Sequence, residues 1–304
     1  MKRLIGEYGE YNSGTLFIVL AGIHGNEKAG IFALEKIFEY FALNKLQFNG
    51  KLVALKCNLT ALEVNQRFIH KDLNRQWYDS KIKKLSALPF GMLNTAEDRE
   101  QVQLLDYIQH ILAQQEDKEN IVMVDLHTTS AAGACMTITN NQPKSVDFAR
   151  MLPVPVISGM TKVLQGTTLE YFENMGIPGI AYEAGQHDDI ESIERMKYGL
   201  ISLFLNAGIL DEKHSNFFTE GIERLRKYNE GLPYVVNVLY HHAISDDDNF
   251  VMKAGYSNFS KVSKGEHLAD DKNGAILAPN TGMILMPLYQ KKGNDGFFIV
   301  EKAS

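Results

Sequence analysis

Residues 15–27 read TLFIVLAGIHGNE, a hydrophobic run that leads directly into His24 and Glu27. The β-branched and large apolar residues of this run are typical of a buried strand. A strand followed by an ordinary turn explains the pattern, and so does a strand whose end carries half of a metal site. The other strand ends of the chain decide between these two interpretations.

The chain has 304 residues, which is enough for one large domain or for a large domain with a smaller one. Hydrophobic residues make up 45% and charged residues 22%, so the disordered and fibrous classes are excluded. The formal net charge of -6 argues against a surface built for nucleic-acid backbones or anionic membranes. We therefore expect no nucleic acid and no membrane, which leaves small molecules or other proteins as partners, and a homo-oligomer is possible.

The N-terminal stretch MKRLIGEYGE contains acidic residues and a glycine that interrupt the apolar run of a secretory signal. The most hydrophobic segment, residues 15–23, is too short to cross a bilayer. We therefore expect a cytoplasmic protein in which Cys57 and Cys135 remain unpaired thiols.

Short β-rich runs alternate with helical patterns over the first two thirds of the chain, which predicts a doubly wound α/β region. The expected strands are 15–23, 51–57, 121–126, 134–139, 154–157 and 179–182. Apolar residues at helical spacing predict helices over 27–43, 97–114 and 190–206.

Beyond residue 210 the sequence changes in character. A charged stretch, DEKHSNFFTEGIERLRKYNEG, has the composition of a linker, and it is followed by short β-rich segments with frequent glycines. We predict a larger α/β domain over residues 1–224 and a smaller all-β domain, a sandwich or partial barrel, over residues 225–304.

Ligands of open α/β sheets bind beyond the carboxyl ends of the strands. His24 and Glu27 follow the first expected strand, His127 follows the strand IVMVDL, and Glu183 ends the segment GIAYE. Two imidazoles and one carboxylate suit zinc, and three protein ligands leave a fourth position for water, as in catalytic sites. The same ligands also hold other divalent ions. Asp125, two residues before His127, shares its strand face and is a candidate partner for that ligand.

The segment NQRFIHKDLNRQW, residues 65–77, lacks regular periodicity and is expected to form a long loop. Its arginines, Arg67 and Arg75, carry guanidinium groups that suit carboxylate recognition and oxyanion stabilisation. Arginines on an ordinary surface loop are the alternative interpretation.

The ordered motifs HGNE, NQRF, DLNR, DLHTT and YEAGQ resemble those of the succinylglutamate desuccinylase and aspartoacylase family, which is related to zinc carboxypeptidases. The resemblance covers about residues 15–200, and the β-rich C-terminus is similar to the family's second domain. It implies a zinc-carboxypeptidase-like mixed sheet flanked by helices, a smaller C-terminal all-β domain, and a zinc-dependent hydrolase of N-acyl amino acids or similar carboxylate-bearing amides.

The resemblance also assigns roles to individual residues. It implies one zinc ion per chain, held by His24, Glu27 and His127, with Glu183 as the general base. It further implies that Arg67 polarises the scissile carbonyl and that the substrate is bound by Asn74, Arg75 and Tyr289.

One departure concerns the substrate. Aspartoacylases of this family use a further arginine upstream of the base, whereas the stretch LEYFENMGIPGIAYE contains none, so specificity for N-acetylaspartate is not carried over. The alternatives to a deacylase are a carboxypeptidase for short peptides and a non-catalytic binding relative. A carrier protein modified at Lys272, within a hairpin-like C-terminal stretch, is a further alternative.

Overall fold

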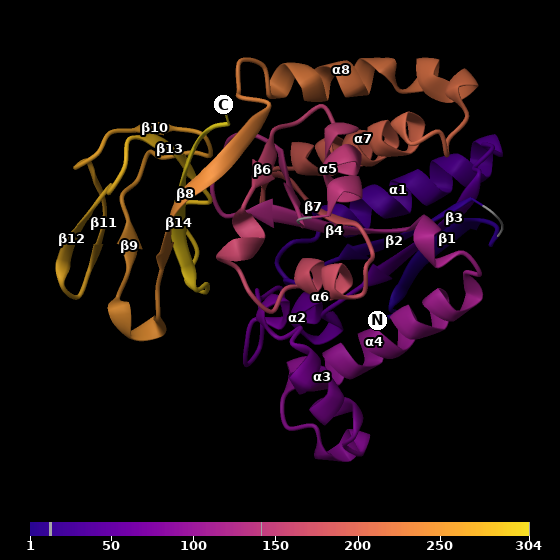
Figure 1. The fold of residues 1–304 in the computed structure, drawn as a ribbon, viewed down its shortest axis with the longest axis horizontal. Coiled ribbons are helices and arrows are strands. Elements are labelled where there is room, and N and C mark those ends of the chain that lie inside the picture. Colours follow the sequence, from indigo (N-terminus) through magenta and orange to yellow (C-terminus); the bar gives the residue numbers. More distant parts are fainter. Residues whose placement is uncertain (12–13, 141, 304) are drawn as a thin grey trace.

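The computed structural model describes residues 1–11, 14–140 and 142–303 (Figure 1). Within this part of the chain, a mixed sheet of 11 strands runs through the molecule. In spatial order its strands are β1 (Leu4–Gly9), β3 (Gly50–Lys56), β2 (Thr15–Ala21), β4 (Ile121–Thr129), β7 (Gly179–Gln186), β5 (Met136–Thr139), β6 (Val156–Ser158), β8 (Val235–Ala243), β14 (Asp295–Lys302), β13 (Gly282–Leu285) and β10 (Lys261–Val262). The expected fold class, a mixed sheet flanked by helices, is confirmed.

The centre of the sheet is parallel. β2 pairs with both β3 and β4, and β4 pairs with β7. β1 is antiparallel to β3, and β5 is antiparallel to β7, which corrects the expectation of a regular doubly wound region. Because parallel strands end at the same edge of a sheet, the segments that follow β2, β3 and β4 meet in one place.

Apolar side chains of the strands point alternately to the two faces of the sheet. Helices cover both faces and bury these side chains. In β2, Leu16 and Ile18 belong to one buried cluster, whereas Phe17 and Val19 belong to another. The first cluster is covered by α3 (Asp79–Ser86), α4 (Ala96–Gln114) and α6 (Thr168–Asn174). The second is covered by α1 (Ala29–Asn44), α5 (Pro143–Arg150), α7 (Glu191–Asn206) and α8 (Thr219–Tyr228), and Figure 1 shows these two layers above and below the sheet.

Short helices connect these elements. α2 (Leu59–Glu63) follows β3, and the Asn58 side chain caps it by accepting a hydrogen bond from the Ala61 N–H. The 3₁₀ helices are η1 (Leu73–Arg75), η2 (Phe90–Met92), η3 (Lys118–Asn120), η4 (Met160–Lys162), η5 (Glu212–Phe217) and η6 (Asp246–Asp248).

The C-terminal part forms a smaller lobe that continues the main sheet. β8 pairs in parallel with β6, and β14, β13 and β10 follow it with antiparallel pairing. A separate antiparallel sheet contains β9 (Val251–Met252), β11 (His267–Asp271) and β12 (Gly274–Leu277). The expected boundary at residue 225 lies inside α8, and the division into residues 1–224 and 225–304 stays a prediction.

The interpretation of residues 211–231 as a linker is wrong, because this stretch forms η5 and α8. α8 packs on α7 so closely that a Cβ atom at Gly221 would lie 2.1 Å from the ring of Tyr198. Leu225 is 1% exposed in the same contact region. The charged residues occupy the outer face of an amphipathic helix, which its composition alone does not distinguish from a linker.

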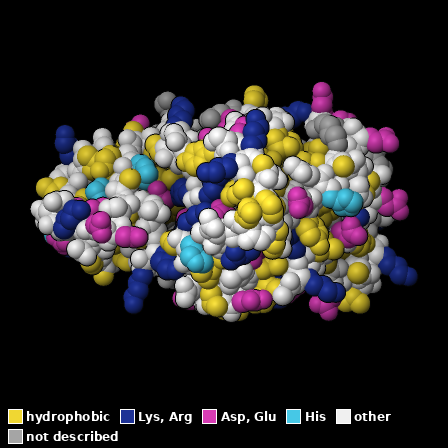
Figure 2. All heavy atoms as spheres, turned by 90° about the horizontal axis from the view of Figure 1, so that it is seen from below, with side chains coloured by type: hydrophobic (Ala, Val, Ile, Leu, Met, Phe, Trp, Pro, Cys, Tyr) yellow, Lys and Arg dark blue, Asp and Glu magenta, His cyan; other side chains and the backbone are white. Residues whose placement is uncertain are grey.

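The surface in Figure 2 has both signs of charge, with Lys and Arg side chains gathered near the junction of the smaller lobe with the larger body. Among the described residues, no helix is both long and apolar enough to cross a membrane. Both cysteines are free and buried, as expected.

We predict that Gly199→Ala lowers the free energy of unfolding by about 1–3 kcal/mol, as overpacking does in closely packed cores. A Cβ atom at this position of α7 would lie 2.5 Å from the ring of the fully buried Tyr182. Urea denaturation followed by circular dichroism measures the change. Gly91→Ala is the control because its Cβ atom would meet nothing within 4 Å; equal stability of the two variants would contradict the prediction.

Candidate active site

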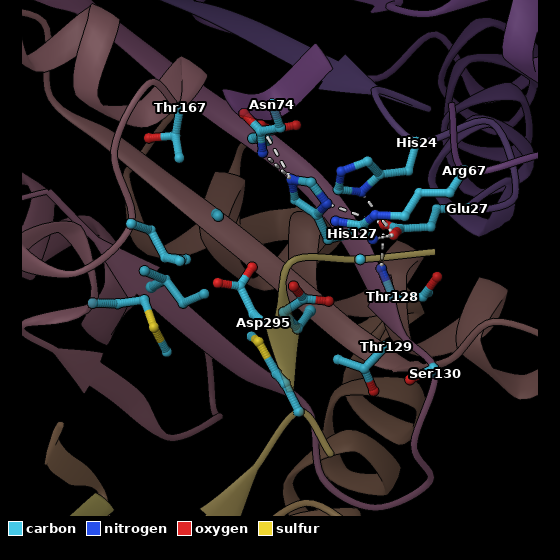
Figure 3. Close-up of a pocket in the computed structure, with 18 of the residues that line it drawn as sticks. His24, Glu27, Arg67, Asn74, His127, Thr128, Thr129, Ser130, Thr167 and Asp295 are labelled. Carbon is cyan, nitrogen blue, oxygen red and sulfur yellow. Dashed lines mark hydrogen bonds and ion pairs between the residues drawn. The ribbon is translucent and has the colours of Figure 1, made fainter. Parts of the chain in front are cut away.

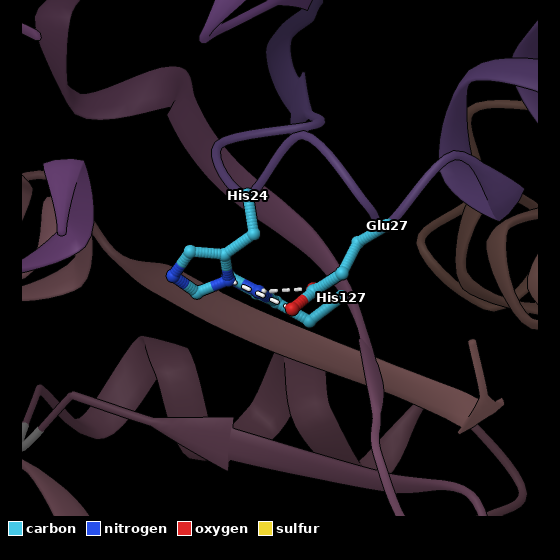
Figure 4. A group of neighbouring side chains, drawn as sticks. All are labelled: His24, Glu27 and His127. Atoms are coloured by element: carbon cyan, nitrogen blue, oxygen red, sulfur yellow. Dashed lines mark hydrogen bonds and ion pairs between the residues drawn. The ribbon is translucent and has the colours of Figure 1, made fainter. Parts of the chain in front are cut away.

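His24, Glu27 and His127 converge at the carboxyl end of the sheet (Figure 4). His24 and Glu27 lie in the turn between β2 and α1, and His127 lies near the end of β4. The Nδ1 atom of His24 is 2.8 Å from one Glu27 carboxylate oxygen, and the Nδ1 atom of His127 is 3.0 Å from the other. Their candidate ligand atoms all lie within 4.8 Å of one another, and all three residues are buried.

A carboxylate lies behind each imidazole. Asp72 Oδ1 is 3.1 Å from Nε2 of His24, and Asp125 Oδ2 is 3.2 Å from Nε2 of His127. Imidazoles that bind metals ordinarily donate their second ring N–H to such a group, which fixes the tautomer. The arrangement leaves both Nδ1 atoms facing Glu27, and it fits a divalent metal held by two imidazoles and one carboxylate. The expectation that Asp125 lies beside His127 is confirmed.

The charges in this cluster stabilise one another. Burial opposes ionisation of Glu27, but the adjacent His24 and His127 hold the pKa of its carboxyl well below the usual range. Burial likewise opposes ionisation of Asp72, whereas Arg67 and His24 lower the pKa of that carboxyl well below its usual value. Both carboxyl groups are therefore negatively charged near neutral pH.

Arg67 lies beside the candidate ligands, on the loop between α2 and η1. Its guanidinium donates from Nε and Nη2 to Asp72, at 3.2 and 2.9 Å, and from Nη1 to Glu27 at 3.4 Å. Two contacts with one aspartate fix the plane of the guanidinium. The side chain also lines the cavity, where Nη1 lies on the side of the candidate metal ligands.

Glu183 is a buried carboxylate in the same cavity. It lies in β7 directly across from His127 in the strand register. Among the described residues, its Oε2 atom has no hydrogen-bond partner. Burial raises the pKa of the Glu183 carboxyl to about 7. A carboxyl group of this kind both accepts and donates protons near neutral pH.

Asn74 and Arg75 lie in η1. In Figure 3, the labelled Asn74 lies on the opposite side of the cavity from Thr128 and Ser130. The Asn74 side-chain oxygen accepts from the Thr168 N–H at 2.9 Å. Arg75 donates from Nη2 to Asp295 at 2.5 Å, although the two residues are 220 positions apart.

Asp295 is a cavity residue that the sequence did not single out. It begins β14, and its second carboxylate oxygen lies 2.7 Å from Nε2 of His241 in β8. Burial opposes its ionisation, but His241 and Arg75 hold the pKa of the Asp295 carboxyl below its usual value. Both side chains of the His241–Asp295 pair are mostly buried.

Tyr289 does not line the cavity in the described part of the chain. Its hydroxyl donates to the backbone oxygens of Lys253 and Tyr256, at 2.9 and 3.0 Å, within the smaller lobe. The neighbouring Leu288 and Gln290 line the cavity. A substrate contact of Tyr289 stays a prediction.

The model of the succinylglutamate desuccinylase/aspartoacylase catalytic domain matches residues 13–202. The chain belongs to this family. Succinylglutamate desuccinylase of Photorhabdus laumondii is 25% identical over 203 residues, which are 61% of this chain and 60% of that relative's length. A probable aspartoacylase of Nostoc is 30% identical over 127 residues, 41% of this chain and 38% of the relative.

Solved structures of the family share the fold. The succinylglutamate desuccinylase/aspartoacylase of Rhodobacter sphaeroides has a TM-score of 0.65 at 16% identity, and the similarity covers 96% of this chain and 86% of that one. Succinylglutamate desuccinylase of Vibrio cholerae has a TM-score of 0.64 at 17% identity, over 95% and 82% of the two chains. The structural likeness therefore includes the smaller lobe, which lies beyond the residues matched by the catalytic-domain model.

His187, which directly follows β7, is a further cavity residue. Its Nδ1 atom lies 2.7 Å from the Thr128 hydroxyl, while the Thr128 N–H donates to Glu27 at 3.1 Å. Asp189, just before α7, accepts from the Glu191 N–H at 3.0 Å.

We predict that His24→Ala and His127→Ala each weaken zinc binding by more than about 100-fold. Removing a side chain that only hydrogen-bonds a metal ligand lowers metal affinity roughly 10- to 100-fold, and loss of the ligand itself should cost more. The reason is that each variant removes one of the three converging groups. Competition with a chromophoric chelator measures the affinity. His110→Ala, an exposed change on α4, is the control; unchanged zinc affinity in both ligand variants would contradict the assignment.

Proposed function

We propose that this protein is a zinc-dependent hydrolase that cleaves the amide bond of an N-acyl amino acid or a similar small carboxylate-bearing amide. One observation carries the proposal: His24, Glu27 and His127 converge on a cavity that also contains Glu183 and Arg67. Membership of a family that includes succinylglutamate desuccinylases and aspartoacylases supports it. The fold supports the same proposal through its likeness to solved members.

Zinc held by His24, Glu27 and His127, one ion per chain, would lower the pKa of a bound water to about 7 and polarise the scissile carbonyl. Glu183 takes a proton from the attacking water and returns it to the leaving amine. Arg67 donates to the oxygen of the tetrahedral intermediate, and Asp72 keeps its guanidinium oriented for this.

Asn74 and Arg75 are proposed to bind the substrate carboxylate. Both side chains line the cavity, and Arg75 has a planar fork of donors that suits a carboxylate. In the structure this arginine is already paired with Asp295, so a substrate carboxylate shares it with that residue. Tyr289 is proposed as a lesser contact that requires a movement of the smaller lobe.

A carboxypeptidase for short peptides is the nearest alternative, because it would use the same metal ligands, base and arginine. Within the cavity, the centre of a water-sized sphere can occupy a volume of about 120 Å³. This volume favours a small amide over an extended peptide. A non-catalytic relative is the other alternative.

The carrier-protein alternative finds less support. Lys272 lies in the turn between β11 and β12, as a modified lysine would, but its Nζ atom is 3.0 Å from an Asp248 carboxylate oxygen. Modification would abolish this ion pair.

A cytoplasmic location and a homo-oligomer stay predictions.

Hydrolysis of a panel of N-acetyl and N-succinyl amino acids and short peptides, by protein of measured metal content, tests the proposal. We expect a chelator to abolish release of the amine from one substrate class and zinc to restore it. One zinc ion per chain with no hydrolysis of any panel member would support the non-catalytic relative instead. Failure to bind any metal would remove the basis of the proposal.

We predict that Glu183→Gln lowers kcat about 10²- to 10⁴-fold, the contribution of a general base, while zinc affinity changes little. The amide keeps the shape of the carboxylate but cannot accept the proton. Steady-state kinetics and metal analysis of the same preparation measure both effects. Glu191→Gln, at the exposed start of α7, is the matched control; full activity of Glu183→Gln would exclude its role as base.

We predict that lysine substitutions separate the roles of the two arginines. Arg67→Lys should lower kcat by about 10²- to 10³-fold, as loss of an oxyanion donor does. Arg75→Lys should mainly raise KM, because a lysine cannot offer two parallel donors to a carboxylate. Initial-rate kinetics on one substrate measure both values, and the same change in kcat and KM for both variants would contradict this division.

A further inference from the structure

The cavity has a polar side and an apolar wall. The polar side carries the candidate metal ligands and Glu183, which Figure 3 shows in part with its labelled His24, Glu27 and His127. The apolar wall is formed by side chains from β5, η4, α6, β7 and the region of β13 and β14. Its members are Ile138, Met160, Leu164, Leu169, Ala181, Met286, Leu288 and Phe298.

This wall is the edge of a main hydrophobic core. Met160 and Phe298 are each 1% exposed and belong to the same buried cluster as Leu104 and Ile108 of α4. Leu164 packs against that cluster from the loop after η4. Side chains fixed by such packing keep their positions when a ligand binds, so the wall is a preformed surface for an apolar group.

The charges in the cavity also restrict the substrate. Among the described residues that line it, Arg67 and Arg75 are the lysine or arginine side chains present. Arg67 is paired with Asp72 and Glu27, and Arg75 is paired with Asp295. The lining also contains four carboxylates, contributed by Glu27, Asp125, Glu183 and Asp295. A first substrate carboxylate can share Arg75. A second one would find neutral donors such as the Ser130 and Thr167 hydroxyls, but no arginine or lysine without an anionic partner among the described lining residues.

We propose that the substrate is a monocarboxylic N-acyl amino acid whose acyl group or side chain is aliphatic, and that this aliphatic group packs on the apolar wall. Amides of dicarboxylic amino acids and succinyl amides are poor substrates, because their second carboxylate finds no unpaired cation in the described lining. The inference rests on the proposed function and adds to it the class of substrate. Residues beyond the matched catalytic domain, Met286, Leu288 and Phe298, take part in the selection.

Comparing kcat/KM for four amides by the zinc-loaded protein tests this inference. N-acetyl-L-leucine places the aliphatic group on the amino acid, and N-hexanoylglycine places it on the acyl side. N-acetyl-L-aspartate and N-succinyl-L-glutamate carry additional carboxylates. We expect one aliphatic substrate to exceed both polycarboxylic ones by at least about tenfold, as burial of a leucine-sized group provides. Preference for either polycarboxylic substrate would overturn the inference and leave the proposed amide hydrolysis intact.

Arginine substitutions on the wall test the same point through the protein. Leu164→Arg places a cation against the apolar surface and should shift the preference at least about tenfold toward the polycarboxylic amides. Leu288→Arg, from the smaller lobe, is a second variant in case the first does not fold. Val163→Arg is the matched control, since Val163 is exposed and lies outside the lining. Equal effects of Leu164→Arg and Val163→Arg would overturn the assignment of the wall.

Calorimetric binding of the same four amides distinguishes the two levels of the argument. If no amide is hydrolysed, the proposed hydrolase fails, but tighter binding of an aliphatic amide would still support the apolar wall as its binding surface. Tighter binding of a polycarboxylic amide, or binding of none, would overturn the inference.

Discussion

Burial of the Glu27 carboxylate is the constraint on which the arrangement of the site depends. A carboxylate that is 3% exposed is costly unless charged or hydrogen-bonding partners surround it. Its partners are the imidazoles of His24 and His127, the guanidinium of Arg67 and the N–H of Thr128. These groups come from the turn after β2, from β4 and from the long loop, and they meet because the parallel strands end together.

The need to pair buried polar groups also applies to the partners of Glu27. Each imidazole that faces Glu27 has a second ring nitrogen, and Asp72 and Asp125 lie against those atoms. Asp125 in turn accepts from the Thr168 hydroxyl at 2.5 Å. The Thr168 N–H also donates to Asn74, so the start of α6 is linked to the loop at η1. A polar network with this many buried partners specifies one arrangement, because a partly satisfied version would be much less stable.

Much of the fold and the centre of the site were predictable from sequence because their signals are local. Hydrophobic runs that lead into His24 and Glu183 indicate both a buried strand and a candidate site residue at or near its end. The strand period places Asp125 on the same face as His127. β1 was missed because its residues are only partly buried, so its hydrophobic pattern is weak. The identity of the bound metal and the roles of Glu183 and Arg67 stay proposals.

Other features of the site have no local signal. Asp72 contacts His24 across 48 positions, and Asp295 contacts Arg75 across 220. An aspartate at the start of a C-terminal strand has the appearance of an ordinary turn residue until the fold brings it to the cavity. The apolar wall could not be predicted from the sequence either. Met160 and Phe298 have the pattern of core residues, and they contact the core on one side and the cavity on the other.

The Arg75–Asp295 ion pair bears on how the proposed substrate recognition is divided between the two parts of the chain. A substrate carboxylate gains less from an arginine that already has a buried anionic partner than from a free one, because both anions compete for the same donors and repel each other. Other contacts must then supply the binding free energy that holds the amide near Glu183 and Arg67. The apolar wall provides such contacts, and it is built jointly by the matched domain and the β13–β14 region. In this chain, therefore, the candidate reaction chemistry lies within the matched domain, whereas the proposed selection of the substrate involves the C-terminal lobe as well.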